Sequence, residues 1–589
     1  MSELDDPSTA FFSIPKAFCP KASPDGKRVI CNWNTTGRFE LHAITVSSGE
    51  RRQLTEGELP LHPEDATYCW TATSDVVLYQ VDRNGNTDVY RVTLNGNRER
   101  AFTVADDTHL WAVNPKMDII YYRVGDNTLR WRNPVTEERG EFPCFPGLDI
   151  QIQATCSVSP DGEWIAYTSV PPEADESATT TYESGLTTYI SRADGSNPTR
   201  ISASNHGYRL TPVQWHPDGE RLLIHRDNGH WKDGRKCGIY DRHSGTVEWI
   251  ADVGAVAFLY NGERILAGAP PRSATELYDV AGNATAIPCE GMFHGCNGTE
   301  AVVGDTGFIV QRHTVDHPYE VLHHDTATGE TTVLFGAEYE QRAIGPDTFV
   351  KPTEVQYEIG GGEVAEGRLF RPVNHENAPT PAIVFFHGQR NRWARRFRPS
   401  VQHLAHQGYA VLLAGCPADG WSHEAHAVFA AAGRWLAQQE GIDPNRVIAY
   451  GHSHGGYNVY MQSVAYPAVW DAFVADTGCV DLRSAKPVGN LRRQLGDPIK
   501  NQLLYRELSP ITYVDEAVGS PLLMIHGADD GWADQPHIFT NALKDYGLVA
   551  GDEYEHIEFS NVGHTPKSRE KQVLWWDTIV TFLDNRLRK

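Results

Sequence analysis

The chain has 589 residues, of which 40% are hydrophobic and 22% charged, a globular composition rather than a disordered or fibrous one. This length predicts at least two domains. The 76 acidic and 52 basic side chains give a formal net charge of −24, which argues against nucleic-acid binding as the main role, because phosphate contacts need clustered cations.

The N-terminal residues MSELDDPSTAFF contain neither the basic nor the apolar region of a signal peptide. Ten cysteines are scattered without a C-x-x-C pair, as in a reduced intracellular protein. No apolar run approaches the roughly 18 residues of a membrane-spanning helix. We therefore expect a cytoplasmic protein without a membrane or nucleic-acid partner, and a homo-oligomer remains possible.

Residues 12 to about 345 consist of short strand-like segments and polar, mostly glycine-containing turns. One strand–turn–strand unit recurs seven times, around residues 47, 94, 135, 193, 243, 281 and 327. A period of about 40–50 residues is typical of propeller blades. We therefore predict a seven-bladed β-propeller over residues 12–345, with an irregular β-sandwich array as the alternative.

Two further features distinguish this N-terminal part. The tetrapeptide Ser-Pro-Asp-Gly at 23–26 returns at 159–162, and as His-Pro-Asp-Gly at 216–219, each time before an apolar strand. Residues 1–350 also hold 49 acidic and 29 basic side chains, so they carry −20 of the net charge of −24. This asymmetry supports two separately built units.

From residue 346 onward, strand-like and helix-like segments alternate. The near-continuous apolar runs, which are typical of strands buried on both faces, span 381–388, 409–415, 446–451 and 521–527. The helix-like stretches span 423–439, 455–465, 535–546 and 567–587. The alternation predicts an α/β-hydrolase domain over residues 346–589, with a doubly wound, mostly parallel sheet.

The sharpest motif is Gly-His-Ser-His-Gly at 451–455, which follows a predicted buried strand and opens a predicted helix. This setting is that of a nucleophile elbow, which presents Ser453 at the end of the strand. In this fold the acid and the base follow the nucleophile in that order, each after a strand. Asp530 and His564 meet this requirement, with Asp529 as the alternative acid.

Acyl transfer through such a triad needs hydrogen-bond donors that face the developing oxyanion. We expect one donor to be the backbone N–H of His454, the residue after the nucleophile. We expect the second to come from the loop after strand 381–388, near Gln389. A plain turn at the strand end is the alternative for this loop.

Two histidine pairs attract attention as possible metal ligands. His423 and His426 form H-E-A-H, and His452 and His454 flank Ser453, but neither pair has zinc-ligand spacing with further ligands in reach. We expect these to be surface or packing histidines. The chain also lacks a phosphate-binding glycine loop, so we expect no metal and no cofactor.

Several stretches resemble the prolyl oligopeptidase family of serine peptidases, most closely its acylaminoacyl-peptidase and dipeptidyl-aminopeptidase branch. These are SPDGKRV, GIDPNRVIAYGHSHGGYN, LLYRELSPITYV, PLLMIHGADD and the Gly-His pair at 563–564, and the resemblance covers nearly the whole chain. It implies a propeller that caps the active site and excludes folded proteins. It also implies that short peptides enter and are cleaved through an acyl-enzyme on Ser453.

The chain departs from the family pattern near the expected substrate site. The family's H-G-G-P is His-Gly-Gln-Arg at 387–390 here, and an arginine-rich run including Arg395 and Arg396 follows. Guanidinium groups suit carboxylates, so these two residues could bind a peptide carboxyl terminus, with an exposed loop or ion pairs to the acidic propeller as alternatives. Trp532 stands in Asp-Gly-Trp-Ala, where many relatives have D-x-x-V, which indicates a different specificity pocket.

An acidic insertion at 171–185 lies in the fourth predicted blade. Glu173, Glu176 or Glu183 could bind a free α-amino group there, although a solvated loop is the alternative.

These observations favour a serine peptidase for short peptides. The alternative is an esterase or other acyl hydrolase with the same triad, because ester and amide hydrolysis share the acyl-enzyme route. A third class is a non-enzymatic propeller module with an inactive hydrolase domain.

Overall fold

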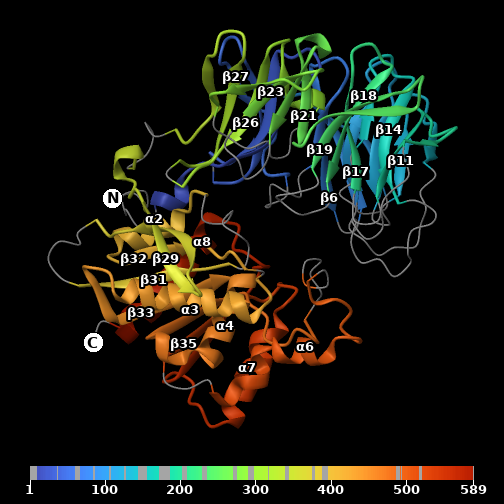
Figure 1. Ribbon diagram of the computed structural model, residues 1–589. Coiled ribbons are helices and arrows are strands. Elements are labelled where there is room, and N and C mark those ends of the chain that lie inside the picture. Colours follow the sequence, from blue (N-terminus) through green and yellow to red (C-terminus); the bar gives the residue numbers. More distant parts are fainter. Residues whose placement is uncertain are drawn as a thin grey trace. The chain divides into compact units, whose positions relative to one another are not determined.

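The computed structural model divides into two compact units, shown in Figure 1, that are described separately. One comprises Pro15–His313 and Tyr319–Ala337, and the other comprises Met1–Ile14, Thr314–Pro318 and Glu338–Lys589. The structure describes residues 10–587 except for 36, 60–66, 84–85, 105–107, 125–127, 143–155, 171–185, 202–208, 228–234, 269–274, 290–297, 316, 339–343, 374–378, 388–395, 419, 486–490, 492–493 and 517–519.

The first unit is built, over its described residues, from seven four-stranded antiparallel sheets. In each sheet four consecutive strands pair in chain order, which is the arrangement of propeller blades. The predicted seven-bladed propeller is confirmed.

The strands of the first four blades are β1 (Ala17–Ala22), β2 (Arg28–Trp33), β3 (Glu40–Thr45), β4 (Arg51–Gln53), β5 (Tyr68–Trp70), β6 (Val76–Arg83), β7 (Asn86–Thr93), β8 (Arg98–Val104), β9 (Thr108–Val113), β10 (Ile120–Val124), β11 (Leu129–Arg132), β12 (Arg139–Glu141), β13 (Cys156–Val158), β14 (Trp164–Ser169), β15 (Thr187–Arg192) and β16 (Thr199–Arg200). Those of the last three blades are β17 (Arg209–Trp215), β18 (Arg221–Asp227), β19 (Lys236–Asp241), β20 (Thr246–Ala251), β21 (Ala255–Leu259), β22 (Arg264–Gly268), β23 (Thr275–Asp279), β24 (Ala284–Ile287), β25 (Val302–Val303), β26 (Gly307–Arg312), β27 (Glu320–Asp325) and β28 (Thr331–Phe335).

The ring closes between the first and the last blade. A single apolar cluster contains Val29 of the first blade and Phe308 of the seventh. The indole Nε1 of Trp33 donates to the Gly336 carbonyl oxygen at 3.2 Å, and Arg51 Nε donates to the Leu334 carbonyl oxygen at 2.9 Å. Closure covers sheet faces that a single blade would expose to water.

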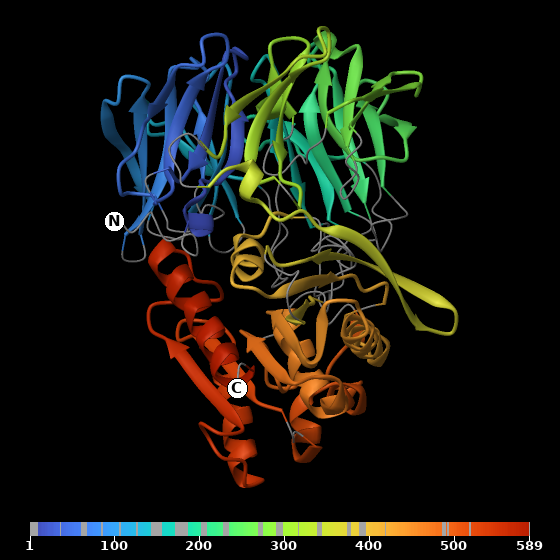
Figure 2. The same cartoon turned by 90° about the vertical axis from the view of Figure 1, so that its left-hand side faces the viewer.

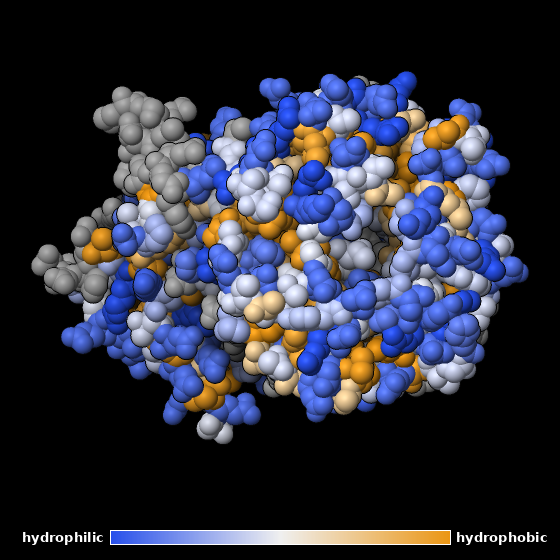
Figure 3. All heavy atoms as spheres, turned by 90° about the horizontal axis from the view of Figure 1, so that it is seen from above, coloured by the Kyte–Doolittle hydropathy of each residue, from blue (hydrophilic) through white to orange (hydrophobic). Residues whose placement is uncertain are grey.

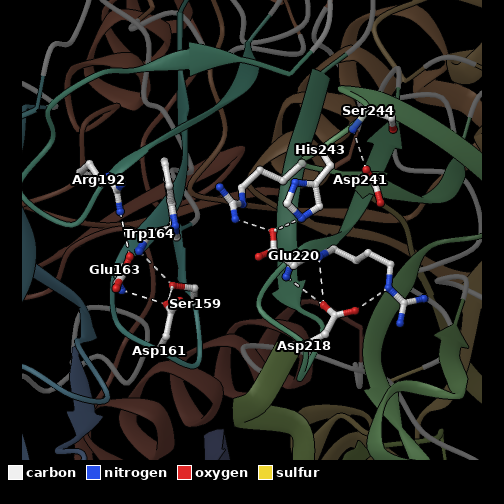
Figure 4. Close-up of polar contacts among 12 residues, drawn as sticks. Ser159, Asp161, Glu163, Trp164, Arg192, Asp218, Glu220, Asp241, His243 and Ser244 are labelled. Carbon is white, nitrogen blue, oxygen red and sulfur yellow. Dashed lines mark hydrogen bonds and ion pairs between the residues drawn. The ribbon is translucent and has the colours of Figure 1, made fainter.

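The repeated Pro-Asp-Gly turns are organised by their aspartates (Figure 4). Asp161 accepts the Ser159 hydroxyl at 2.5 Å and the Glu163 backbone N–H at 3.0 Å. Asp218 accepts a hydrogen bond from the Glu220 backbone N–H at 2.9 Å and forms an ion pair with Arg221. The carboxylate therefore accepts hydrogen bonds from backbone N–H groups of the turn that do not pair with a neighbouring strand.

The second unit contains an eight-stranded sheet with the order β29-β30-β32-β31-β33-β34-β35-β36. The strands are β29 (Thr353–Gly360), β30 (Glu363–Phe370), β31 (Thr380–Phe385), β32 (Ala410–Ala414), β33 (Ile442–His452), β34 (Ala472–Asp476), β35 (Leu522–Gly527) and β36 (Tyr554–Phe559). All neighbours from β32 to β36 are parallel, and the β29–β30 and β30–β32 pairs are antiparallel. The β29–β30 hairpin, yellow in Figure 2, extends beyond the rest of the sheet.

Helices cover both faces of this sheet. Apolar side chains of α3 (His423–Ala437), α4 (His454–Ala465) and α7 (Asp534–Asp545) belong to the cluster on one face, and α3 and α4 lie in front of the strands in Figure 1. Those of α2 (Pro399–His406) and α8 (Arg569–Leu587) belong to the cluster on the other face. This layering confirms the predicted doubly wound α/β-hydrolase fold.

The remaining helical elements are short: α6 (Gln502–Glu507) and the 3₁₀ turns η1 (Phe11–Ser13), η2 (Tyr260–Gly262), η3 (Gly298–Ala301), η5 (Pro346–Thr348), η7 (Pro467–Val469) and η8 (Pro510–Glu516). No helix of the described part is long and apolar enough to cross a membrane. The face of the molecule in Figure 3 is mostly hydrophilic, with only small scattered hydrophobic patches.

The interior strand β32 offers a stability test. Leu412 is fully buried, and removing its side chain should lower the free energy of unfolding by about 2–5 kcal/mol. Val364, on the outer hairpin, is 52% exposed, so Val364→Ala should cost less than about 1 kcal/mol. The urea midpoints of Leu412→Ala and Val364→Ala check this prediction, and equal shifts would contradict it.

Candidate active site

Ser453 is the single residue between β33, which ends at His452, and α4, which begins at His454. Its backbone has φ 59° and ψ −118°, a conformation that residues with a side chain rarely adopt. Its N–H donates to the carbonyl oxygen of Asp476 at 2.8 Å, which holds the turn against β34. The side chain therefore projects at the end of the strand, as the elbow motif predicts.

Two glycines allow this turn to close. A Cβ atom on Gly451 would lie closer than 3.0 Å to the backbone of Gly455, and one on Gly455 would be equally close to the carbonyl oxygen of Phe386. Real Cβ atoms essentially never approach backbone atoms so closely. The close approach of three backbone segments, rather than a positive φ, thus requires glycine at both positions.

The structure brings the three predicted triad residues together. His564 Nε2 lies 2.7 Å from the Ser453 hydroxyl oxygen, and His564 Nδ1 lies 3.0 Å from Asp530 Oδ1. Asp530 follows β35 and His564 follows β36, and these strands are parallel neighbours. The alternative acid, Asp529, is exposed, and its backbone N–H donates to Val562.

Burial and charge act against each other on this pair. Burial raises the pKa of Asp530. The hydrogen bond from His564, the charge of that ring and the Trp532 backbone N–H together lower it by more than burial raises it, so the net pKa lies below its usual value. Burial lowers the pKa of His564, but the hydrogen bond and charge of Asp530 and the charge of Asp476 raise it above 6.5. An ionised Asp530 thus favours the Nδ1–H tautomer of His564, in which Nε2 can accept a hydrogen bond from the Ser453 hydroxyl.

A second carboxylate, Asp476, lies under the elbow and was missed in the sequence. It ends β34, is 3% exposed, and accepts hydrogen bonds from the Tyr450 hydroxyl at 2.7 Å and from Trp575 Nε1 at 3.3 Å. Its Oδ1 also lies 3.0 Å from His452 Nδ1. Its position at the carboxyl end of the strand after the elbow strand is the signal that could have identified it.

Of the two predicted oxyanion donors, only His454 lies within the described residues. His454 opens α4, in the helical turn whose N–H groups lack intrahelical acceptors. Its side chain is buried and stacks on Trp421 with ring centroids 3.8 Å apart, and burial lowers its pKa to about 4. Only its backbone is therefore available for the reaction, and Gln389 lies outside the described residues.

The predicted substrate-binding residues are spread around the triad. Trp532 is buried, and its ring meets the ring of His564 edge-on with centroids 5.7 Å apart. Arg396 is half-buried and lies three residues before α2, whereas Arg395 lies outside the described residues. The acidic insertion at 171–185 also lies outside the described residues.

Residues 421–589, which contain the elbow and both partner loops, match the family model described as the prolyl oligopeptidase family. The chain carries a prolyl oligopeptidase family domain. The match confirms the resemblance seen in the sequence motifs for residues 421–589.

Two curated relatives are both named dipeptidyl-peptidase 5. The protein of Porphyromonas endodontalis is 26% identical over 222 residues, which cover 33% of this chain and 31% of that protein. The protein of Porphyromonas gingivalis is 22% identical over 495 residues, which cover 76% of this chain and 69% of that protein. The alignments thus span about one third and about two thirds of the relatives' lengths.

Solved structures extend the likeness to the propeller. A puromycin-hydrolyzing peptidase of Mycobacterium tuberculosis superposes with a TM-score of 0.76 over 100% of this chain and 96% of the other, at 16% identity. At this identity the likeness shows the fold alone. The propeller and the family domain therefore occur together in a known architecture.

The glycine at the base of the elbow supports a test of the turn. Gly455→Ala should force the turn apart, lower the unfolding free energy by about 1–3 kcal/mol, and displace Ser453 from His564. Gly345→Ala is the control, because a Cβ there meets no atom within 4 Å and its φ is −138°. Thermal unfolding of both variants measures the difference, and comparable melting temperatures would contradict the prediction.

Proposed function

We propose that the chain is a serine peptidase that hydrolyses short peptides, with Ser453 as nucleophile, His564 as general base and Asp530 as its orienting acid. One observation carries the proposal: the continuous contact from Ser453 Oγ to His564 Nε2 at 2.7 Å and from His564 Nδ1 to Asp530 at 3.0 Å. The match to the prolyl oligopeptidase family supports peptides as the substrate class.

The geometry supports a two-stage reaction. Ser453 Oγ attacks the peptide carbonyl carbon while its proton passes to His564 Nε2, and the resulting oxyanion accepts the His454 N–H. We propose a second donor near Gln389. His564 then gives its proton to the departing amine, which leaves an acyl-enzyme. Water attacks the ester with His564 again as base, which releases the acid and restores Ser453.

We further propose that Trp532 forms a wall of the substrate site, because its ring already packs against the catalytic imidazole. Arg395 and Arg396 are proposed to bind a peptide carboxylate, since a guanidinium can donate two parallel hydrogen bonds to it. The names of the relatives, dipeptidyl-peptidase and puromycin-hydrolyzing peptidase, are consistent with small aminoacyl substrates.

An esterase is the second candidate, because the same triad hydrolyses esters. Amide hydrolysis is the more demanding reaction, since a poor leaving group must be protonated by His564. A panel of aminoacyl-arylamides, N-blocked peptides and p-nitrophenyl esters distinguishes the two. Turnover of esters alone would favour the esterase.

Replacing the nucleophile is the direct test of the triad. Ser453→Ala should abolish labelling by a fluorophosphonate probe and lower kcat by about 10⁴-fold or more, because no other hydroxyl contacts His564 Nε2 in the described part. Ser484→Ala, an exposed serine elsewhere in the same unit, is the control and should leave labelling unchanged. Labelling that survives in Ser453→Ala would exclude this mechanism.

The raised pKa of His564 predicts the acid limb of the pH profile. Only the neutral ring accepts the serine proton, so kcat/KM should fall as the pH drops through a pKa above 6.5. Asp476→Asn removes a charge that raises this pKa, so the limb should move to lower pH. Asp545→Asn, at the exposed end of α7, is the control. If the acid limb of the kcat/KM profile lies at the same pH in Asp476→Asn as in the wild type, the electrostatic role of Asp476 is refuted.

A further inference from the structure

Three histidines converge outside the triad. His526 of β35, His537 of α7 and His556 of β36 each offer one ring nitrogen, and these nitrogens all lie within 4.8 Å of one another. Glu558 joins them, because its Oε2 lies 3.1 Å from His526 Nε2 and 3.0 Å from His537 Nε2. Three imidazoles thus meet within the described part of the chain, and one carboxylate contacts two of them.

The sheet register explains why residues far apart in sequence meet here. His526 pairs with Glu558, and Met524 pairs with His556, in the parallel ladder of β35 and β36. Paired residues project on the same face of a sheet, and so do residues two apart along a strand. Met524 packs in the same apolar cluster as Phe539 of α7, so this face is the one that α7 covers, and α7 brings His537 to the group.

The distances suit a tetrahedral ion. Zinc binds imidazole nitrogens and carboxylate oxygens at about 2.0–2.2 Å, so tetrahedral ligand atoms stand roughly 3.3 Å from one another. The two Glu558 contacts of 3.0 and 3.1 Å are already close to that separation. The nitrogens within 4.8 Å need only small side-chain movements, and the donor set of nitrogen and oxygen suits Zn²⁺.

The ring of His556 supplies a further observation. His556 Nδ1 faces the Thr540 hydroxyl at 3.3 Å, and its other nitrogen, Nε2, is buried without a hydrogen-bond partner among the described residues. A buried nitrogen left without a hydrogen bond is unfavourable, because it has lost its contact with water. The Thr540 contact is also of the kind that orients a metal-binding imidazole through its second nitrogen. A hydrogen-bonded histidine–glutamate cluster alone leaves His556 Nε2 unsatisfied.

Two of the four side chains are accessible from solvent. His537 and Glu558 have side chains that are 55% and 42% exposed, which opens the group to ions from solvent.

We propose that these four side chains form a structural zinc site that ties β35, β36 and α7 together. Four protein ligands close the coordination shell, which is typical of structural rather than catalytic zinc. His526 lies four residues before Asp530, and Glu558 lies six before His564. A bound ion would thus fix the two strands from which the acid and the base of the triad extend. This site departs from the sequence-based expectation of no metal.

The test measures binding of Zn²⁺ to the full-length chain after removal of metal with a chelator. Isothermal titration should give one Zn²⁺ per chain, and Co²⁺ should give the visible absorption of tetrahedral coordination. His537→Gln and His556→Gln should each weaken Zn²⁺ binding by more than about 100-fold, beyond the effect of losing an outer-shell partner. His423→Gln, an exposed histidine of α3, is the control and should bind as the wild type does.

His537 is exposed, so its variant should keep its fold and remain a valid test even if His556→Gln is unstable. Wild-type protein that binds well below one equivalent, or His537→Gln that binds Zn²⁺ as tightly as the wild type, would overturn the proposal. The readout is Zn²⁺ binding rather than turnover of a substrate, because Zn²⁺ that coordinates His564 would also change turnover. The result is therefore independent of the proposed peptidase activity.

Discussion

Parallel pairing of β33, β34, β35 and β36 is the constraint on which the candidate active site depends. Parallel strands place their carboxyl ends along one edge of the sheet. Ser453, Asp476, Asp530 and His564 follow or end these four strands in turn. Residues separated by up to 111 positions can then contact each other without any long side chain reaching across the domain.

Two aspartate–histidine pairs lie side by side at that edge, and they differ in the exposure of the histidine, which is 24% for His452 and 43% for His564. The ring of His564 stands 5.1 Å from that of His452, so both histidines share one electrostatic environment. The Asp476 carboxylate accepts hydrogen bonds from Tyr450 and Trp575 and also contacts His452, so its oxygens are occupied by neighbouring side chains of the fold. Asp530 and His564 instead sit on loops; the Asp530 side chain is as buried as that of Asp476, whereas the His564 side chain is 43% exposed. The pair of His452 and Asp476 supports the elbow, and the charge of Asp476 raises the pKa of His564.

The sequence predicted the features that have a local signal. The blade repeat and the strand–turn–helix setting of Ser453 are visible within short windows, and the family order of nucleophile, acid and base places Asp530 and His564. Asp476 was missed because it ends an ordinary apolar strand, and only the pairing of β33 with β34 brings it under Ser453. The histidine cluster has no motif at all: its members lie 11 and 19 residues apart on three elements, and only strand register unites them.

The acidity of the propeller follows in part from its turns. Asp25, Asp161 and Asp218 each accept backbone N–H groups just before a strand, and Asp241, Asp279 and Asp325 do so directly after one. The pKa of each is lowered, since the backbone donors favour the charged form. Because the turn recurs from blade to blade, the number of such aspartates rises with the number of blades. These six aspartates are six of the 49 acidic side chains in residues 1–350, so closing strand ends accounts for part of the charge of −20 without a surface that attracts a cationic partner.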